Sequence, residues 1–479
     1  MMERFRVVIL MKKVVTAIIP FALIAVVSAS GLAAENRGAF VLRDARIVPV
    51  SGPVIEHGTV VVRDGLIEAV GANITPPADA WAIDCKGLTV YPGLIDALST
   101  WGLTNSPPAA AGGGGGRGGG GRGGAAAAPA AVTITAAPAA AAPSRGPEDR
   151  PSNTAYIKAA DEIYPNDRAV ETFRNGGFTT AVTFPHGNIF SGQGSVIDLA
   201  GERAGEMVVA PAVGQYITLG GGGRGGGGRS YPGSLMGVIA YIRQIYLDAD
   251  HYKTANAIYA KHPQGLPRPA YDRTLEGVIA SPRILIPASR DVEIERMLAF
   301  TKELKVNAIL YGGFEAWRAT DVLKQSGTPV LLSLKYPVKV QDADPEMEES
   351  LRVLEMREKA PTSAGALSKA GVKFAFYSDG IATTRELNAA VRKAIDSGLD
   401  QASAVRALTL SAAEMYGVSD RLGSIDKGKI ANLVVTEGDL FAAQTKVKYV
   451  FVDGDKFEPV AEPPAGRGGG RGQGGPAVQ

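Results

Sequence analysis

Short apolar runs alternate with helical patterns through residues 92–419 of this 479-residue chain, and this alternation restricts the fold more than any other feature. The apolar runs cover residues 179–184, 283–286, 308–311, 330–334 and 374–377. Helical patterns such as 292–304 and 386–397 lie between them. Alternation of this kind predicts a parallel sheet with right-handed crossovers, and the length favours a closed barrel. We therefore expect an α/β protein with a TIM-like (β/α)8 barrel over residues 92–419.

The two ends of the chain are rich in short strands. Residues 58–71 predict a hairpin, with apolar runs on both sides of an Asp64-Gly65 turn. Residues 422–435 and 447–454 show the same pattern of short apolar runs and turn residues. Two β-rich ends around a long α/β middle predict a small β-sandwich domain assembled from both termini, over residues 38–91 and 420–456.

The first 34 residues have the pattern of a secretory signal peptide. Lys12 and Lys13 precede an apolar run at 14–27, and small residues follow at 28–34. The apolar run is shorter than the roughly 20 residues of a membrane span, so we expect an exported, periplasmic protein without a stable span after cleavage. An uncleaved membrane anchor is the alternative. Cys85 is the single cysteine, which excludes an intrachain disulfide.

Three low-complexity tracts interrupt this plan. Gly- and Ala-rich sequence at 105–150 and 220–232 predicts flexible insertions in the barrel, and residues 457–479 predict a disordered tail. Arginines punctuate the tracts, which leaves open a surface interaction protein that binds through them. The formal net charge is only +2, and this near-neutral balance argues against a nucleic-acid partner.

Motifs at both ends of the predicted barrel resemble one family. Residues 92–96 read Pro-Gly-Leu-Ile-Asp, Ser378-Asp379 ends a predicted strand, and a Leu-Gly-Ser-Ile segment begins at Leu422. Together they resemble the amidohydrolase superfamily, and within it the imidazolonepropionase-like and deacetylase-like exported members. The resemblance implies a barrel with a metal centre, zinc in the family, at the C-terminal ends of its strands. A metal-bound hydroxide there would attack a non-peptide carbon–nitrogen bond.

Most of the metal ligands that the resemblance implies are replaced in this chain. The two histidines of the first strand fall on Leu98 and Thr100. The ligands of the fourth, fifth and sixth strands fall on Asp198, Pro287 and Gly312. The aspartate of the last strand is kept as Asp379. Because a divalent ion needs about four to six ligands, we expect no metal or one weakly bound divalent ion, with Asp379 and Asp198 as the candidate ligands.

Three residues remain as candidates for chemistry: Asp379, Lys335 and His186. Lys335 ends the seventh predicted strand, where it could form a metal-free polar centre with Asp379 or an ion pair that fills the space of the missing metals. His186 follows the strand at 179–184, where it could face the barrel mouth or simply bond nearby backbone. We favour the ion pair and the backbone bond, because no motif matches a Ser-His-Asp or Schiff-base arrangement.

Two functions follow from this pattern. The first is a hydrolase of non-peptide carbon–nitrogen bonds whose metal site is degenerate. The second is a pseudoenzyme: a non-catalytic periplasmic protein that binds a small-molecule ligand, or a partner subunit of an intact amidohydrolase. A homo-oligomer is compatible with either function.

Overall fold

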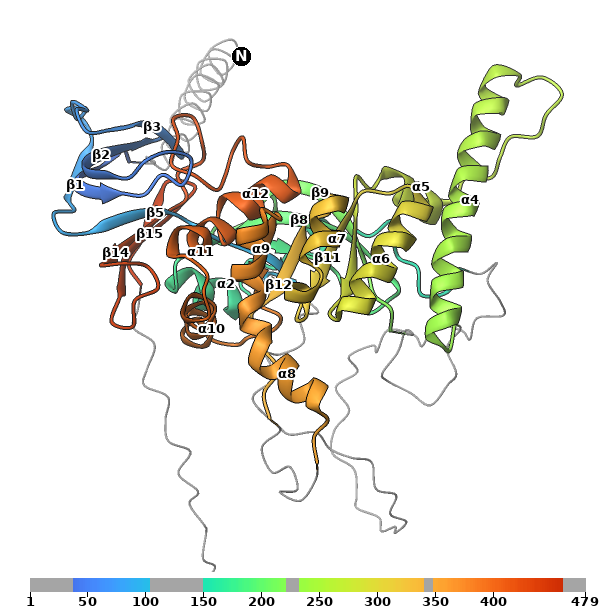
Figure 1. Ribbon diagram of the computed structural model, residues 1–479. Helices are drawn as coiled ribbons and strands as arrows, with labels where there is room; N and C mark the ends of the chain where they lie inside the picture. Colours follow the sequence, from blue (N-terminus) through green and yellow to red (C-terminus); the bar gives the residue numbers. More distant parts are fainter. Residues whose placement is uncertain (1–37, 104–149, 221–231, 340–347, 460–479) are drawn as a thin grey trace, which may run out of the picture.

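The computed structural model describes residues 38–103, 150–220, 232–339 and 348–459. The predicted signal peptide lies outside these residues, as do nearly all of the two predicted insertions and of the predicted tail. The described residues form two eight-stranded sheets, one a small β domain and the other the wall of a barrel (Figure 1).

The β domain combines strands from both ends of the chain. Its strand order is β16-β15-β14-β5-β1-β2-β3, and β4 pairs with β1 at the side. The strands are β1 (Phe40–Ile47), β2 (Ile55–Arg63), β3 (Leu66–Gly71), β4 (Trp81–Asp84), β5 (Thr89–Pro92), β14 (Leu433–Glu437), β15 (Lys446–Val452) and β16 (Asp455–Phe457). The antiparallel pairing of β5 with β14 joins the two ends of the chain in one sheet.

The barrel sheet follows chain order from its first strand to its last. Its strands are β6 (Leu94–Ser99), β7 (Phe178–Thr183), β8 (Phe190–Asp198), β9 (Val208–Ile217), β10 (Ile284–Ala288), β11 (Ala308–Gly312), β12 (Val330–Ser333) and β13 (Phe374–Tyr377). A single residue, Gly93, separates the end of β5 from the start of β6 and links the two sheets directly. The fold class expected from the sequence, a TIM-like barrel with a β domain built from both chain ends, is confirmed.

One barrel strand departs from the expected parallel order. β8 pairs antiparallel with both β7 and β9, while the other paired neighbours in this sheet run parallel. The reason is the connection from β7 to β8, which has only residues 184–189. A crossover to a parallel strand needs about a dozen residues or more, so a link this short must return the chain antiparallel.

The first and last barrel strands are joined by a side chain. Asp96 of β6 accepts hydrogen bonds from the backbone N–H of Ser378 at 3.0 Å and from its hydroxyl at 2.5 Å. Ser378 directly follows β13, and Asp96 is fully buried. The carboxyl group thus takes the place of ladder hydrogen bonds where the barrel closes.

Helices cover the outside of the barrel. They are α2 (Arg168–Asn175), α3 (Ala204–Met207), α4 (Leu235–Lys261), α5 (Arg273–Ala280), α6 (Asp291–Leu304), α7 (Thr320–Ser326), α8 (Leu351–Lys359), α9 (Ser363–Ala370), α10 (Thr384–Asp396), α11 (Gln401–Ala407) and α12 (Leu410–Tyr416). Short 3₁₀ turns occur at Ala159–Glu162, Ala316–Arg318 and Ala360–Thr362. α4 projects from the body on the side away from the β domain (Figure 1). Within the described part of the chain, no helix is long and apolar enough to cross a membrane.

The sequence of α10 shows why these helices form where they do. The hydroxyl of Thr383 caps its first turn by accepting a hydrogen bond from the backbone N–H of Glu386 at 3.2 Å. Leu387, Val391 and Ala394 recur at helical spacing and are buried against the barrel.

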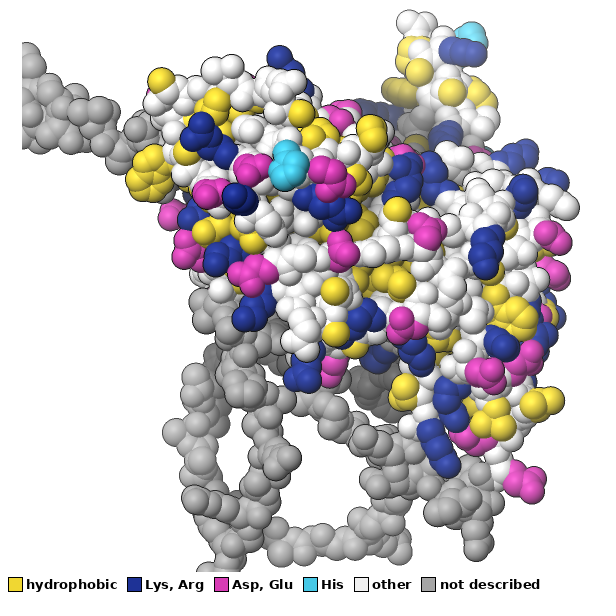
Figure 2. Space-filling model, turned by 60° about the vertical axis from the view of Figure 1, so that its left-hand side comes forward, with side chains coloured by type: hydrophobic (Ala, Val, Ile, Leu, Met, Phe, Trp, Pro, Cys, Tyr) yellow, Lys and Arg dark blue, Asp and Glu magenta, His cyan; other side chains and the backbone are white. Residues whose placement is uncertain are grey.

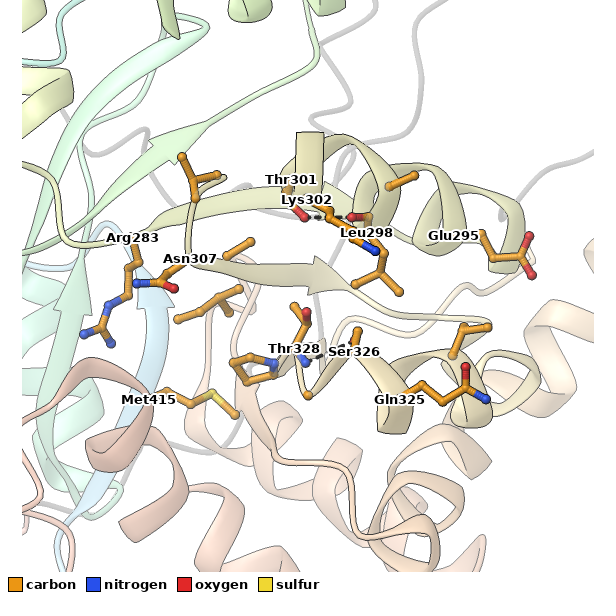
Figure 3. Close-up of a pocket in the computed structure, with 17 residues that line it drawn as sticks. Arg283, Glu295, Leu298, Thr301, Lys302, Asn307, Gln325, Ser326, Thr328 and Met415 are labelled. Atoms are coloured by element: carbon orange, nitrogen blue, oxygen red, sulfur yellow. Dashed lines mark hydrogen bonds between the residues drawn. The ribbon is translucent and has the colours of Figure 1, made fainter. Parts of the chain in front are cut away.

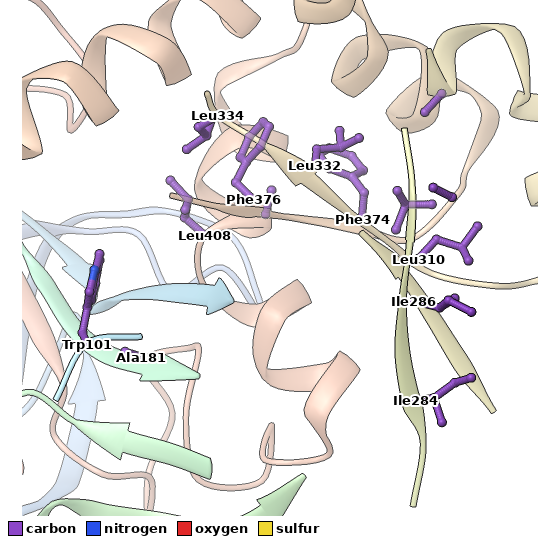
Figure 4. Close-up of a cluster of buried hydrophobic side chains, with 14 of the residues drawn as sticks. Trp101, Ala181, Ile284, Ile286, Leu310, Leu332, Leu334, Phe374, Phe376 and Leu408 are labelled. Carbon is purple, nitrogen blue, oxygen red and sulfur yellow. The ribbon is translucent and has the colours of Figure 1, made fainter. Parts of the chain in front are cut away.

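Alternation along the barrel strands divides the core into an outer and an inner layer. Ile284, Ile286, Leu310, Phe374 and Phe376 face outward and form the cluster between strands and helices (Figure 4). The residues between them face inward and fill the barrel, including Leu285, Ile309, Leu331 and Ala375. This two-residue period is the geometry of a strand buried on both faces, and it decides which side chains reach the barrel mouth.

The surface carries both signs of charge. On the face shown in Figure 2, basic and acidic side chains are interspersed over the β domain and the neighbouring part of the barrel.

Candidate functional site

The inward-facing side chains at the C-terminal ends of the barrel strands are mainly tyrosines. Barrel enzymes place their functional groups at this end. Tyr216 of β9, Tyr311 of β11 and Tyr377 of β13 each follow an interior residue of the same strand at a spacing of two or three residues. Ser333 of β12 takes the same place between Tyr311 and Tyr377 in the sheet. Each of these residues reaches the mouth because of its register in a buried strand.

The tyrosine rings form a continuous aromatic surface across the mouth. The ring centroids of Tyr216 and Tyr311 lie 5.2 Å apart, and those of Tyr311 and Tyr377 lie 6.5 Å apart with perpendicular planes. The Tyr311 hydroxyl donates to the backbone carbonyl of Ile217 at 3.1 Å, which fixes the direction of this ring. Burial raises the pKa of Tyr311 and Tyr377 well above the ordinary value of 10.0, so both phenols are neutral at physiological pH.

Asp379 lies at the edge of this aromatic surface. Its Oδ2 accepts a hydrogen bond from the hydroxyl of Ser333 at 2.8 Å. The carboxylate raises the pKa of Tyr216, Tyr311 and Tyr377, an effect smaller than that of burial, which shows that its charge acts on all three rings. The residue is exposed and has a φ of 50°, a left-handed conformation that aspartate adopts more readily than most residues. Asp379 therefore lies at the barrel mouth, where the sequence predicted a functional group.

His186 lies at the opposite end of the same surface. Its Nδ1 donates to the backbone carbonyl of Phe184 at 2.8 Å, and its ring centroid is 5.0 Å from that of Tyr216. The residue is partly open to solvent, but burial of the ring among its neighbours lowers its pKa; the Phe184 bond and the charge of Asp379 oppose this shift. His186 thus both faces the mouth and bonds the backbone, so the two alternatives drawn from the sequence are compatible. We refer to His186, Tyr216, Tyr311, Tyr377, Ser333 and Asp379 as the mouth cluster.

Lys335 was predicted to pair with Asp379, but its side chain is not part of this cluster. Its side chain is exposed, and among the described residues it is Ser333 that donates to the Asp379 carboxylate. The backbone N–H of Lys335 instead donates to the Ser333 hydroxyl at 3.1 Å. The tight turn after β12 explains the difference, because it directs the Lys335 side chain to solvent while Ser333 takes the position beside Asp379.

Asp198 lies at the other end of the barrel, and its prediction as a metal ligand beside Asp379 is wrong in this structure. It ends β8, which runs antiparallel, so it pairs with Thr180 near the start of β7. Asp198 is buried and accepts hydrogen bonds from Asn432 at 2.7 Å and from the hydroxyl of Thr180 at 3.0 Å. Burial raises its pKa to about 7, against the opposing effect of these two bonds. Its contacts tie the barrel to the β domain.

The positions of the expected histidines do not provide metal ligands. Leu98 packs in the barrel interior with Tyr216 and Tyr377, and Pro287 has no side-chain donor. On β11 the side chain that faces inward is Tyr311, whereas Gly312 follows Leu310 on the outer face, so the predicted position is displaced by one residue. Among the described residues, no three His, Cys, Asp or Glu side chains are grouped closely enough to hold a metal ion. These side chains do not fit the family's metal centre.

Sequence reasoning missed part of this site. Tyr216, Tyr377 and Ser333 carry no motif, and only their place at the ends of apolar strands could have indicated them. Asp96, which the Pro-Gly-Leu-Ile-Asp motif did contain, is a buried carboxyl whose pKa burial raises to about 7 although the Ser378 bonds oppose this. Asp96 lies behind the mouth cluster and accepts a hydrogen bond directly from Ser378, the residue before Asp379.

A separate groove of about 900 Å³ lies at the N-terminal ends of β10 and β11 (Figure 3). Arg283, Asn307 and Thr328 line it near the strand starts, and Lys302 and Gln325 line it from α6 and α7. This is the end of the barrel away from Asp379. Because barrel chemistry occurs at the opposite face, the mouth cluster and not this groove is the candidate functional site.

Two comparisons with known sequences match parts of the chain. Residues 344–456 match the model of the Amidohydrolase family. A segment of 72 residues is 39% identical to an adenine deaminase of Moorella thermoacetica and covers 15% of this chain and 12% of the deaminase. The chain therefore shares only a small part of this relative's length.

Solved structures share the fold over most of the chain. An amidohydrolase from Thermotoga maritima MSB8 superposes with a TM-score of 0.67 at 24% identity, covering 88% of this chain and 100% of the other. A prolidase crystallised with N-methylphosphonate-L-proline gives 0.52 at 18% identity, covering 88% of this chain and 99% of the other. The match over residues 344–456, the shared fold and the motifs around Asp96 and Asp379 together support the resemblance of this chain to the amidohydrolase superfamily.

Proposed function

We propose that this protein is a non-catalytic member of the superfamily that binds a small organic ligand at the barrel mouth. One observation carries the proposal: Leu98 and Pro287 occupy positions where the family resemblance expects histidines, and Tyr311 is the inward-facing side chain beside Gly312, a third such position. Neither a leucine nor a proline side chain can donate an electron pair to a metal. The family's metal-bound hydroxide therefore lacks the ligands that would hold it.

The tyrosines do not replace the missing ligands. The Tyr311 phenol is neutral, because burial raises its pKa, and its hydroxyl is already bonded to the Ile217 carbonyl. The space is also filled, since Leu98, Tyr216 and Tyr377 belong to one interior cluster. A surface of buried rings with an exposed carboxylate at its edge is suited to ligand contact rather than to a metal centre.

The backbone of β11 supports the same conclusion. Gly312 has a φ of 112°, which side-chain-bearing residues rarely adopt, and a Cβ there would lie 2.5 Å from the Ser289 hydroxyl oxygen. A histidine at this position would be strained. A Gly312→His substitution would therefore not restore a ligand at this position without a change in the backbone.

Metal-free hydrolysis by Asp379 is the competing function. It would require a carboxylate placed to activate water beside a bound substrate. Asp379 is exposed and bonded to Ser333, and the contacts of His186 within the described residues are to Phe184 and Tyr216 rather than to a nucleophile. This geometry supports binding over turnover.

Metal content and turnover of the full-length protein test the proposal. After dialysis into metal-free buffer, we expect far less than one equivalent of zinc by plasma mass spectrometry. Zinc retained at about one or two equivalents would overturn the proposal. Hydrolysis of cyclic amides or N-acyl substrates that disappears in the Asp379→Asn variant would also overturn it, whereas residual hydrolysis equal in both proteins would be contamination.

The location and partner of the protein belong to the same proposal. We propose an exported, periplasmic protein that works as a homo-oligomer or beside an intact amidohydrolase; the basic and apolar pattern of residues 1–34 supports export. Fractionation of cells that express the full chain tests the location, and a cytoplasmic, uncleaved product would contradict it.

A further inference from the structure

We propose that the ligand of the mouth cluster is an organic ammonium cation, held over the ring of Tyr311 and paired with Asp379. This inference rests on the proposed function, since it requires a mouth used for binding. It adds the chemical class of the ligand, which follows from how aromatic rings and charge are combined at this site.

The aromatic part of the site is continuous and only partly covered. His186, Tyr216, Tyr311 and Tyr377 make successive ring contacts at 5.0, 5.2 and 6.5 Å. Tyr216 and Tyr377 are 7% and 5% exposed and form the floor, whereas Tyr311 between them is half-buried. The electron-rich faces of such rings attract a cation within about 6 Å of the ring centroid.

The charge of the site has the sign that a cation requires. Asp379 is exposed, its position is fixed by the Ser333 hydroxyl at 2.8 Å, and its charge acts on Tyr216, Tyr311, Tyr377 and His186. The three phenols are neutral, and the pKa of His186 is lowered, so the imidazole adds no positive charge at neutral pH. Asp96, the other carboxyl near these rings, is buried behind them.

Neighbouring basic side chains do not occupy the site. Lys335 is directed to solvent, and Arg290 after β10 pairs with Glu293 at 2.6 Å. Among the described residues, the Asp379 carboxylate forms no ion pair, and the neutral hydroxyl of Ser333 donates a hydrogen bond to it. Aromatic faces next to an anionic group that no cation neutralises form the arrangement that recognises alkylammonium groups.

A pair of isosteric probes separates charge from shape. Choline and its uncharged carbon analogue 3,3-dimethylbutan-1-ol have the same outline, so they differ only in the cationic centre. We would measure the Kd of each for the full-length protein by ligand-observed NMR titration. We expect choline to bind at least about 5-fold more tightly than the neutral analogue.

Variants assign the effect to the two parts of the site. Asp379→Asn should raise the Kd for choline on the order of 3- to 10-fold and leave that for the neutral analogue unchanged. Tyr311→Leu should also weaken choline binding, whereas Tyr311→Phe, which keeps the ring, should retain most of it. Asp396→Asn is the matched control, because Asp396 is an exposed aspartate at the far end of α10 and should have no effect.

The outcomes separate this inference from the proposed function. If the neutral analogue binds as tightly as choline, or if Asp379→Asn leaves choline binding unchanged, the cation inference is wrong while a non-catalytic mouth stands. If neither probe binds, the cation inference is also wrong. If zinc is retained or substrate is hydrolysed, the proposed function fails first. Circular dichroism of each variant, expected to match the parent protein, excludes loss of folding as the cause.

Discussion

Replacing Asp96 with asparagine should change how the stability of this protein depends on pH. Asp96 is fully buried, and its carboxyl joins the first barrel strand to Ser378 after the last. Burial raises its pKa from the ordinary 3.8 to about 7, and the Ser378 bonds oppose this only in part. Asparagine keeps an acceptor for the Ser378 N–H but cannot ionise, so the variant isolates the cost of the charge.

The sign of the effect follows from proton linkage. A carboxyl whose folded pKa lies above its unfolded value binds the proton more tightly when folded, so its contribution to stability is largest below pH 3.8 and is lost as the pH rises toward 7. Between pH 4.5 and 8, pKa values of 3.8 and about 7 give a loss of about 3 kcal/mol in the free energy of unfolding. Over this pH range, the free energy of unfolding of the parent protein should fall by this amount relative to that of the Asp96→Asn variant.

Urea unfolding at several pH values provides the assay. Trp101 is 5% exposed and stacks on Phe173 at 3.7 Å, so its fluorescence reports the loss of barrel packing. Asp198 has a similarly raised pKa and contributes to the pH dependence of both proteins, so only their difference is attributed to Asp96. A difference in unfolding free energy that stays constant from pH 4.5 to 8 would refute the reasoning, because Asp96 would then have the same pKa in both states.

Three further substitutions test the packing that holds the site. Asn432→Ala removes the donor at 2.7 Å from buried Asp198 and the acceptor for the Asp453 N–H. We expect the free energy of unfolding, measured by urea titration, to fall by about 2–4 kcal/mol. The control Asn256→Ala, on α4, should change it little. Gly93→Ala places a Cβ 2.0 Å from the Thr179 hydroxyl oxygen between the two sheets and should cost about 1–3 kcal/mol by the same titration, whereas Gly205→Ala, with open space around it, should cost almost nothing. Arg352→Ala leaves the carboxylate of Glu315, itself 2% exposed, without its partner at 2.6 Å, and a loss of about 1–3 kcal/mol is expected in thermal unfolding; an unchanged midpoint would show that the pair is dispensable.

The sequence predicted the parallel strands of the barrel well because of how they are buried. Strands covered on both faces read as continuous apolar runs, and the runs expected at 308–311 and 374–377 are β11 and β13 within one residue. The hairpin at Asp64-Gly65 was predicted equally well. Both turn residues have positive φ, and this turn type favours Asp and Gly at those positions. Local chemistry was sufficient where each element is determined by its own residues.

The direction of β8 could not be obtained from the same signals. The sequence placed Asp198 on a fourth strand by resemblance, but Gly192 and Gly194 break the apolar run before it, so the run gives no sign of the length or direction of β8. In the structure Gly194 makes room for the ring of Phe184, since a Cβ there would lie 2.1 Å from it. Space left for a neighbouring side chain depends on the tertiary structure, so the glycines alone do not show that a strand passes through them.

The misplaced Asp198 follows directly from that strand. Position along the sequence suggested a ligand on a parallel strand, where every C-terminal end meets at the mouth. One antiparallel strand reverses the rule, so the last residue of β8 lies beside the first residues of β7 and contacts Asn432 of the β domain. The carboxylate that a parallel barrel would have offered to a metal instead joins two domains. Among the described residues, Asp379 is the carboxylate that remains in the mouth cluster, and one carboxylate beside three tyrosines can pair with an organic cation but cannot by itself complete a metal's coordination sphere.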